Sequence, residues 1–254
     1  MSSHTTVVTA FYKFGKSKHS DEEYAVWIDN FFRCTTSPVV CFCDNAQYFQ
    51  ERYGGGKNNR TFIERPFDSF ELTTPEWIAK WKRQVDQDPE KTMHSWELYA
   101  VWALKQEFVH KAIQLNTYDS QYFVWCDIGC FREPSNFPTT PRFAEATPSK
   151  VSPGHIFILK IHETDSSTHI GGGVLAGDIQ AWQGFRSSYL SILNTFMDHG
   201  VFCGKDQTLY RFMIERKLIP FQVIETSGEW GTLPRFKNPK FSSRWFYLTF
   251  YLSP

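Results

Sequence analysis

The chain has 254 residues, and its 27 lysines and arginines balance its 27 aspartates and glutamates, so the formal net charge is zero. A dedicated nucleic-acid-binding protein normally carries a clear basic excess, so this balance argues against that class. Hydrophobic residues make up 41% of the chain and charged residues 21%, which is too apolar for a disordered protein. Aromatic residues reach 17%, which predicts a large core with rings left over to line a site.

Two further features bear on where the chain resides. No apolar run approaches the roughly 18 residues that span a bilayer, and the first residues lack the basic segment and apolar stretch of a secretory signal. The six cysteines lack the paired C-x-x-C spacing of zinc ribbons, which favours buried free thiols. We therefore expect a cytoplasmic protein with no transmembrane segment, built as one domain over residues 1–254.

Taken in chain order, strand and helix patterns alternate. β-branched and aromatic residues predict a first strand over 5–12, and the capping box Ser20-x-x-Glu23 predicts a helix that runs to about Arg33. The next patterns predict, in order, a buried strand at 38–43, a helix at 46–53, a strand at 61–64, a helix starting at Thr74 and Pro75, a long helix at 95–115 and a strand at 121–126.

The pattern weakens after Arg132. The stretch 133–153 holds five prolines and is typical of a surface loop. Beyond it the patterns predict strands at 155–160 and 168–176, a helix capped by Asp178 and stopped by Gly200, a last helix at 205–217 and a strand-like tail at 246–252.

The alternation of strands and helices predicts an α/β fold with a mostly parallel central sheet flanked by helices. In such sheets ligands bind outside the carboxyl ends of the strands, at the point where the strand order reverses. The residues directly after the strands are therefore the candidates for a site, namely residues 10–13, Asp44, and Asp127 with Gly129.

Several α/β chemistries have local motifs that are missing from this chain. There is no G-x-G-x-x-G after the first strand, no G-x-x-x-x-G-K-[ST], no G-x-S-x-G and no H-E-x-x-H. These absences argue against a dinucleotide-binding Rossmann domain, a P-loop nucleotide hydrolase, an α/β-hydrolase and a zinc metalloprotease with the H-E-x-x-H motif.

The segment 121–132 carries the most informative chemistry. An apolar strand ends in Asp127, and Gly129 and Arg132 follow closely. Mg²⁺ commonly needs only one or two protein carboxylates when phosphate and water fill its remaining positions, and Asp127 would supply one. Gly129 would let the backbone approach a ligand, and Arg132 could pair with a phosphate. An aspartate that only caps the following turn is the equally compatible alternative.

Several segments of the chain resemble a known family. The matching segments are 7–12, 39–44, 95–105 and 122–132, with looser matches at 171–178 and 205–209. Together they resemble the HtrL/YibB (WlaTC-type) family of glycosyltransferases. The resemblance implies a GT-A-like nucleotide-sugar fold, with a nucleotide-sugar-binding half at 1–132 and an acceptor-side half at 154–254. It also implies transfer of a sugar from a nucleotide-diphosphate sugar to a glycan or another hydroxyl acceptor.

The strand-end rule and the resemblance together indicate residues for each substrate. The expected donor-binding residues are Thr9, Ala10, Phe11, Tyr12, Lys13, Asp44, Lys105, Asp127, Gly129 and Arg132. The expected acceptor-binding residues are Gly171, Gly172, Gly173, Gln207 and the loop-borne Trp230. For Asp44 a plain helix cap, and for Lys105 a solvated lysine, are the alternatives.

Asp206 and Asp127 are the expected catalytic residues. We hypothesise that the three glycines at 171–173 form the floor beneath the donor sugar, because glycines inside a strand are tolerated mainly where a ligand or another backbone comes close. Asp206 would contact the acceptor hydroxyl, as general base in an inverting reaction or as orienting group in a retaining one. A helix cap is the alternative for Asp206.

The metal requirement follows less directly from the resemblance. Many GT-A enzymes carry Asp-x-Asp at this strand end, whereas here Gly129 stands in place of the second carboxylate. A divalent cation, Mn²⁺ or Mg²⁺, would be held by Asp127 alone or together with Asp206 or Glu229, and a metal-free reaction stays open. Two other functions also stay open: a noncatalytic sugar- or nucleotide-binding module of the same fold, and a nucleotidyltransferase.

Overall fold

The computed structural model describes residues 5–17, 19–56, 58–132, 142–162, 168–226 and 247–254. The strands are β1 (Thr5–Phe11), β2 (Val39–Cys43), β3 (Arg60–Glu64), β4 (Tyr122–Cys126), β5 (Ile156–His162), β6 (Thr168–Asp178) and β7 (Phe221–Thr226). The α-helices are α1 (Asp21–Cys34), α2 (Ala46–Phe49), α3 (Pro75–Gln87), α4 (Trp96–Leu115), α5 (Thr147–Lys150), α6 (Ile179–Asp198), α7 (Asp206–Glu215) and α8 (Tyr247–Tyr251). A π-helical turn (Gln50–Gly54) extends α2, and two 3₁₀ turns (Phe67–Ser69 and Glu71–Thr73) precede α3.

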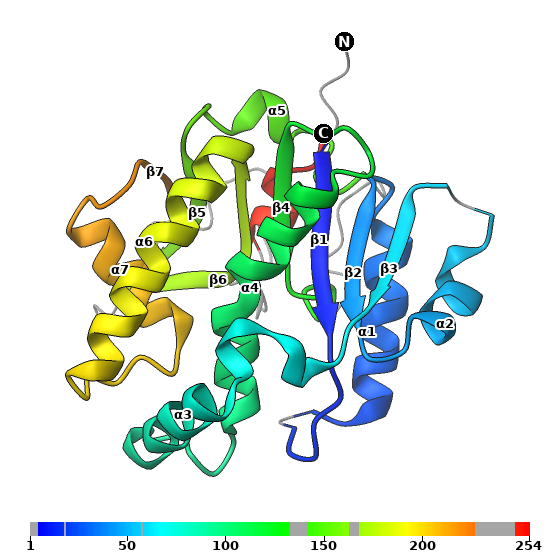
Figure 1. The fold of residues 1–254 in the computed structure, drawn as a ribbon. Coiled ribbons are helices and arrows are strands. Elements are labelled where there is room, and N and C mark those ends of the chain that lie inside the picture. Colours follow the sequence, from blue (N-terminus) through cyan, green and yellow to red (C-terminus); the bar gives the residue numbers. More distant parts are fainter. Residues whose placement is uncertain (1–4, 18, 57, 133–141, 163–167, 227–246) are drawn as a thin grey trace.

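The described strands form one seven-stranded sheet in the order β3-β2-β1-β4-β6-β5-β7 (Figure 1). β1 pairs in parallel with both β2 and β4, and β5 pairs in parallel with β7. β6 is antiparallel to its neighbours β4 and β5, and it alone among the described strands runs against the others. The predicted α/β fold with a mostly parallel sheet and flanking helices is therefore confirmed.

Helices cover both faces of the sheet and create two apolar layers. On one face, α3, α4, α6 and α7 bury large rings, among them those of Trp81, Tyr99, Phe108 and Trp182. On the other face, α1, α2 and α8 bury Phe31, Phe49 and Leu248. The high aromatic content thus fills the core, as the composition predicts. Among the described helices, none is both long and apolar enough to cross a membrane.

Helix caps fix where three helices begin. Ser20 and Glu23 form the predicted capping box, Ser95 accepts from the backbone of Leu98, and Asp178 accepts from the backbone N–H of Ala181 at 2.7 Å. These caps confirm the starts predicted for α1, α4 and α6. α4 carries site residues, so the cap at Ser95 also fixes which positions of the helix these residues occupy.

The C-terminal tail differs from the prediction. The apolar, β-prone tail predicts a strand, but the structure has the helix α8 at Tyr247–Tyr251. Leu248 and Leu252, four residues apart, are both buried, which is helical spacing. Lys150 also donates to the carbonyl of Tyr251. Tertiary packing therefore overrides strand propensity there.

Two described elements of the second half have no counterpart in the sequence-based prediction. The edge strand β7 follows α7, and the short helix α5 lies inside the proline-rich stretch expected to be a loop. β7 has only half-buried residues over 221–224, so its apolar signal is weak.

Candidate active site

A cavity of about 710 Å³ lies where the strand order reverses. From β1 the sheet continues to β2 on one side and to β4 on the other, so the chain segments after β1 and β4 diverge at their carboxyl ends. These segments line the cavity together with β6 and the beginnings of α4 and α7. The volume is within the range of roughly 300–1,000 Å³ of small-molecule sites. We call it the switch-point cavity, and its position is the expected one for a ligand.

A buried lysine joins two carboxylates in the wall of this cavity. The Nζ of Lys105, on α4, lies 2.8 Å from Asp206 Oδ2 and 3.2 Å from Asp127 Oδ1. It also donates to the carbonyl of Gly172 at 2.8 Å. Lys105 is 3% exposed and Asp206 5%. These groups form the Lys105 cluster, which carries two negative charges and one positive charge.

Charge and burial act against each other in the Lys105 cluster. Burial disfavours the ammonium of Lys105, but the charges of Asp127 and Asp206 outweigh burial and hold its pKa above the usual value. Burial raises the pKa of Asp127, the Lys105 ammonium partly offsets this rise, and the charge of Asp206 adds to it. The two carboxylates thus favour the charged form of Lys105, which holds the strand end of β4 against the start of α7.

Asp127 keeps one carboxylate oxygen for a ligand. Its Oδ1 accepts from Trp125 Nε1 at 2.7 Å and contacts Lys105, whereas its Oδ2 has no hydrogen-bond partner among the described residues. The side chain is 36% exposed and lines the cavity. This arrangement fits a Mg²⁺ or Mn²⁺ ion with one protein carboxylate, the rest of its shell being phosphate and water. Asp206 does not fit as a second ligand because it is buried against Lys105.

The glycines predicted to approach a ligand also have neighbours within the protein. A Cβ at Gly172 would lie 2.9 Å from Asp206 Oδ2, so this glycine makes room for the Lys105 cluster. A Cβ at Gly129 would lie 3.2 Å from the ring of Trp27, over which the guanidinium of Arg132 lies at 4.4 Å. Gly172 and Gly173 line the cavity, but Gly171 faces Leu159 instead. The hypothesised three-glycine floor is therefore reduced to two residues.

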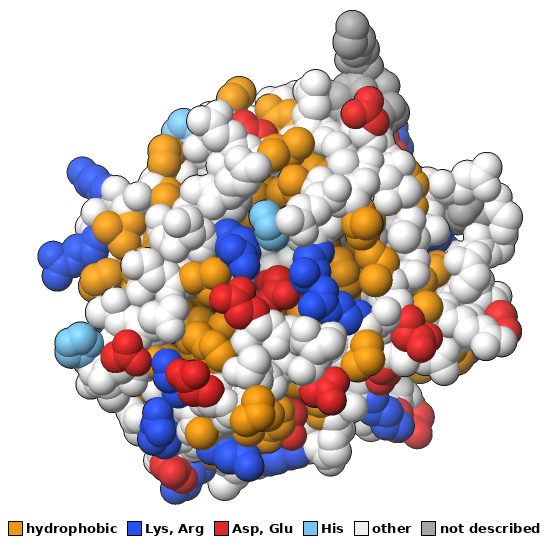
Figure 2. Space-filling view, in the orientation of Figure 1, with side chains coloured by type: hydrophobic (Ala, Val, Ile, Leu, Met, Phe, Trp, Pro, Cys, Tyr) orange, Lys and Arg blue, Asp and Glu red, His pale blue; other side chains and the backbone are white. Residues whose placement is uncertain are grey.

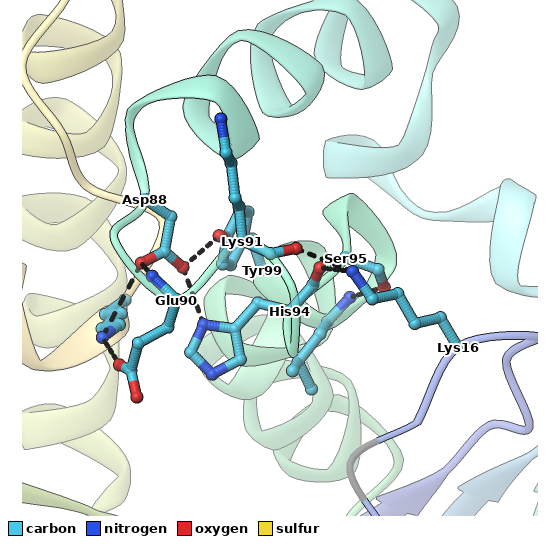
Figure 3. A network of polar contacts seen from close by, with 9 residues as sticks. Lys16, Asp88, Glu90, Lys91, His94, Ser95 and Tyr99 are labelled. Atoms are coloured by element: carbon cyan, nitrogen blue, oxygen red, sulfur yellow. Dashed lines mark hydrogen bonds and ion pairs between the residues drawn. The ribbon is translucent and has the colours of Figure 1, made fainter.

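A second polar group lies at the α3–α4 connection, and Figure 3 shows it from close by. Asp88 accepts from Tyr99 Oη, contacts His94 Nδ1 at 2.7 Å and accepts from the backbone N–H of Glu90 at 2.8 Å. Lys205 Nζ pairs with Glu90 and lies 3.9 Å from Asp88. We call these five residues the Asp88 network; Glu90, His94 and Lys205 line the switch-point cavity.

Asp88, Glu90 and His94 are close enough to hold a metal ion, since their ligand atoms lie within 4.8 Å of one another. In the structure, however, the ammonium of Lys205 already stands beside the two carboxylates. The Lys205 charge and hydrogen bond lower the pKa of Glu90. An ion at this place would have to displace Lys205, so the residues as placed do not fit a metal.

Lysine side chains complete the lining of the cavity. Lys13 pairs with Asp21, and Lys16 donates to the carbonyls of Lys91 and His94 at 2.7 and 2.8 Å (Figure 3). Figure 2 shows acidic and basic side chains next to one another on the face in view, without a large patch of one sign. This mixture agrees with the zero net charge and does not resemble a nucleic-acid-binding surface.

The structure brings most of the predicted site residues together. The cavity is lined by Ala10, Phe11, Tyr12, Lys13, Lys105, Asp127, Gly129, Arg132, Gly172, Gly173, Asp206 and Gln207. Thr9, Asp44 and Gly171 do not line it; Thr9 is fully buried in β1. Trp230 and Glu229 lie outside the described residues.

The alternative interpretation of Asp44 and Asp206 as helix caps is wrong. The cap of α2 is Asn45 rather than Asp44, and Asn45 accepts from the backbone of Tyr48. Asp206 is the first residue of α7, whose cap position is Lys205 and has no side-chain capping bond.

Sequence reasoning missed the Asp88 network and Trp102, which also lines the cavity. The spacing Asp88-x-Glu90-x-x-x-His94 was the available signal, but it belongs to a charged connection between two helices and matches no known motif.

Neither the protein-family models nor the curated protein sequences give a match to this chain. Among solved structures, the chain is similar to 4-diphosphocytidyl-2C-methyl-D-erythritol synthase from Anaerococcus prevotii, with a TM-score of 0.48 and 9% sequence identity over 99% of this chain and 96% of that chain. A likeness this distant says nothing about activity, and the site itself is the basis of the functional inference.

Proposed function

We propose that the protein is a glycosyltransferase that moves a sugar from a nucleotide-diphosphate sugar to a hydroxyl of a glycan or similar acceptor. The observation that carries the proposal is the Lys105 cluster in the wall of the switch-point cavity, which presents the open carboxylate oxygen of Asp127 at the end of β4. Strand ends at a switch point are where α/β sheets bind their ligands.

The donor would lie along the carboxyl ends of β1 and β4. Residues 10–13 would contact the nucleoside, and Lys16 and Arg132, which line the same cavity, would face the diphosphate. A divalent cation held by Asp127 would supply charge neutralisation for the leaving nucleoside diphosphate. Asp206 would act as an orienting group, because its carboxylate is buried and paired with Lys105.

Nucleotidyl transfer is the second candidate. The observation that favours it is the number of cations around the cavity, because Lys13, Lys16, Arg132 and Lys205 all line it and a triphosphate carries more negative charge than a diphosphate. Since Lys13 and Lys205 already pair with Asp21 and Glu90, we rank this function below glycosyl transfer.

A thermal-shift panel tests the proposal. Nucleotide-diphosphate sugars, each with and without Mn²⁺ or Mg²⁺, are compared with nucleoside triphosphates and sugar phosphates. Binding at a hundredfold excess over Kd stabilises by about 2.7 kcal/mol. For a chain of this size that corresponds to a rise in Tm of roughly 5–10 °C. We expect such a rise with at least one nucleotide sugar. A rise with triphosphates alone would favour nucleotidyl transfer, and no rise with any nucleotide would contradict both functions.

A further inference from the structure

We propose that His94, held in place by Asp88, is the catalytic base that takes the proton from the acceptor hydroxyl. This inference rests on the proposed glycosyl transfer and adds the acceptor side of the same cavity to it.

The geometry of a base oriented by a carboxylate is present in the Asp88 network. Asp88, whose side chain is fully buried, contacts His94 Nδ1 at 2.7 Å, and Tyr99 donates to the same Asp88 oxygen. A carboxylate that accepts from Nδ1–H fixes the neutral imidazole with its lone pair on Nε2. Figure 3 shows the imidazole turned toward Asp88. Asp88 therefore sets both the orientation and the tautomer of His94.

The other nitrogen of His94 is available to a ligand. The side chain is 8% exposed and lines the switch-point cavity, and Nε2 has no hydrogen-bond partner among the described residues. A ligand in the cavity can therefore donate a hydrogen bond to Nε2. The ring of Trp102 lies edge-on to the imidazole at 5.3 Å between centroids and lines the same cavity, where it could stack on a sugar.

The chain connects this base to the donor side of the cavity. Lys205 contacts the carboxylates of Asp88 and Glu90, and the next residue, Asp206, contacts Lys105. Consecutive Cα atoms are about 3.8 Å apart, so the two groups are joined through neighbouring residues, and members of both line the switch-point cavity. An acceptor between them would have His94 on one side and the donor at Asp127 on the other.

Charged groups of both signs surround His94. Asp88 and Glu90 provide negative charge, Lys205 is paired with them, and Lys16 donates to the backbone carbonyl of His94. Tyr99 stays a donor, because burial and the charge of Asp88 raise its pKa. An imidazolium formed during the reaction would thus be stabilised by Asp88.

The transfer step balances as follows. The acceptor O–H gives its proton to His94 Nε2 while the acceptor oxygen forms a bond to the anomeric carbon of the donor sugar. The bond between that carbon and the phosphate oxygen breaks, and the electron pair leaves with the nucleoside diphosphate. His94 then returns its proton to water.

Steady-state kinetics across pH test the proposal in the full chain, with a nucleotide sugar that the wild type turns over. His94→Gln is expected to lower kcat/KM for the acceptor by about 10²- to 10⁴-fold. It should also abolish the acid-side limb of the pH profile, which in the wild type reflects protonation of the base. Asp88→Asn should lower the rate as well, because the amide can donate to Nδ1 and move the proton to Nε2. His110→Gln, the same change on α4 away from the cavity lining, is the matched control and should leave kcat and KM unchanged.

A second readout does not depend on activity. In ¹⁵N-labelled wild type, the His94 imidazole should show a protonated Nδ1 and an unprotonated Nε2 near neutral pH, and Asp88→Asn should reverse this pattern. A wild-type pH profile and rate in His94→Gln, or a protonated Nε2 in the neutral wild-type ring, would overturn the proposal while the transferase function stands. A wild type that turns over no nucleotide sugar would overturn both.

Discussion

Lys105→Met is expected to lower the free energy of unfolding by about 3–5 kcal/mol near neutral pH. The variant keeps the volume of the side chain but removes the cation that Asp206 and Asp127 share, at 2.8 and 3.2 Å. Asp206 is 5% exposed, so its carboxylate would remain buried without a counter-charge. Removing one partner of a buried ion pair costs far more than the pair contributes in net stability, because the remaining charge has lost its solvation.

The loss of unfolding free energy in Lys105→Met should depend on pH in a specific way. Burial opposes the Lys105 charge but the two carboxylates outweigh it, so its pKa is raised in the folded state. A base with a raised folded-state pKa contributes in full below its unfolded-state pKa and loses that contribution only as the pH rises through the folded value. In Lys105→Met, protonation of the unpaired carboxylates relieves the penalty. The difference from wild type should therefore shrink as the pH falls from 7 to about 4.

Urea unfolding at several pH values measures this difference, with Lys80→Met as the control. Lys80 pairs at 3.4 Å with Glu76 and Asp198, whose side chains are 77% and 63% exposed, so its loss should cost under about 1 kcal/mol. Equal and pH-independent losses in the two variants would show that the Lys105 cluster is no more than a surface ion pair.

Asp127→Asn is expected to reduce transfer by at least about 10²-fold while leaving the fold intact. The amide oxygen can still accept from Trp125 and Lys105, but the open oxygen that would face a cation or phosphate becomes an uncharged donor or acceptor. The effect should lie in kcat/KM for the donor.

The stability of Asp127→Asn should not fall with its activity. Burial raises the pKa of Asp127, so its charged form costs stability, and this cost grows as the pH rises from about 4 through the raised value. Because the side chain is 36% exposed, the effect at pH 7 should stay under about 1 kcal/mol. Asp127→Asn should therefore melt at or slightly above the wild-type temperature. Asp198→Asn, on the exposed end of α6, serves as the control for activity. A large drop in Tm with proportionate activity would assign Asp127 a structural role.

Local signals in the sequence account for most of the fold. The capping box at Ser20, the cap at Ser95 and the buried strand at 39–43 each depend on residues within a few positions, and such patterns can be recognised without a structure. The tail at 246–252 shows the limit of this reasoning. Its aromatic residues have strand propensity, but the helical spacing of Leu248 and Leu252 is decided by the surface against which they pack.

The site was predictable as a set of positions but not as a set of contacts. The rule of strand ends places Asp127 at the cavity, and the Asp206 start of α7 was also expected there. That Lys105 would join both carboxylates depends on how α4 crosses the sheet, which no local pattern encodes. The partnership of Asp88 with His94 likewise depends on the path of an irregular connection and on Tyr99, one turn into the next helix.

Product identification tests the central claim most directly. The wild type is incubated with the nucleotide sugars that stabilise it, with and without a hydroxyl acceptor, and the released nucleotide is identified by chromatography. The account predicts acceptor-stimulated release of nucleoside diphosphate, and its loss in Asp127→Asn. Release of pyrophosphate from a nucleoside triphosphate and a sugar phosphate, with no nucleoside diphosphate from any nucleotide sugar, would contradict it.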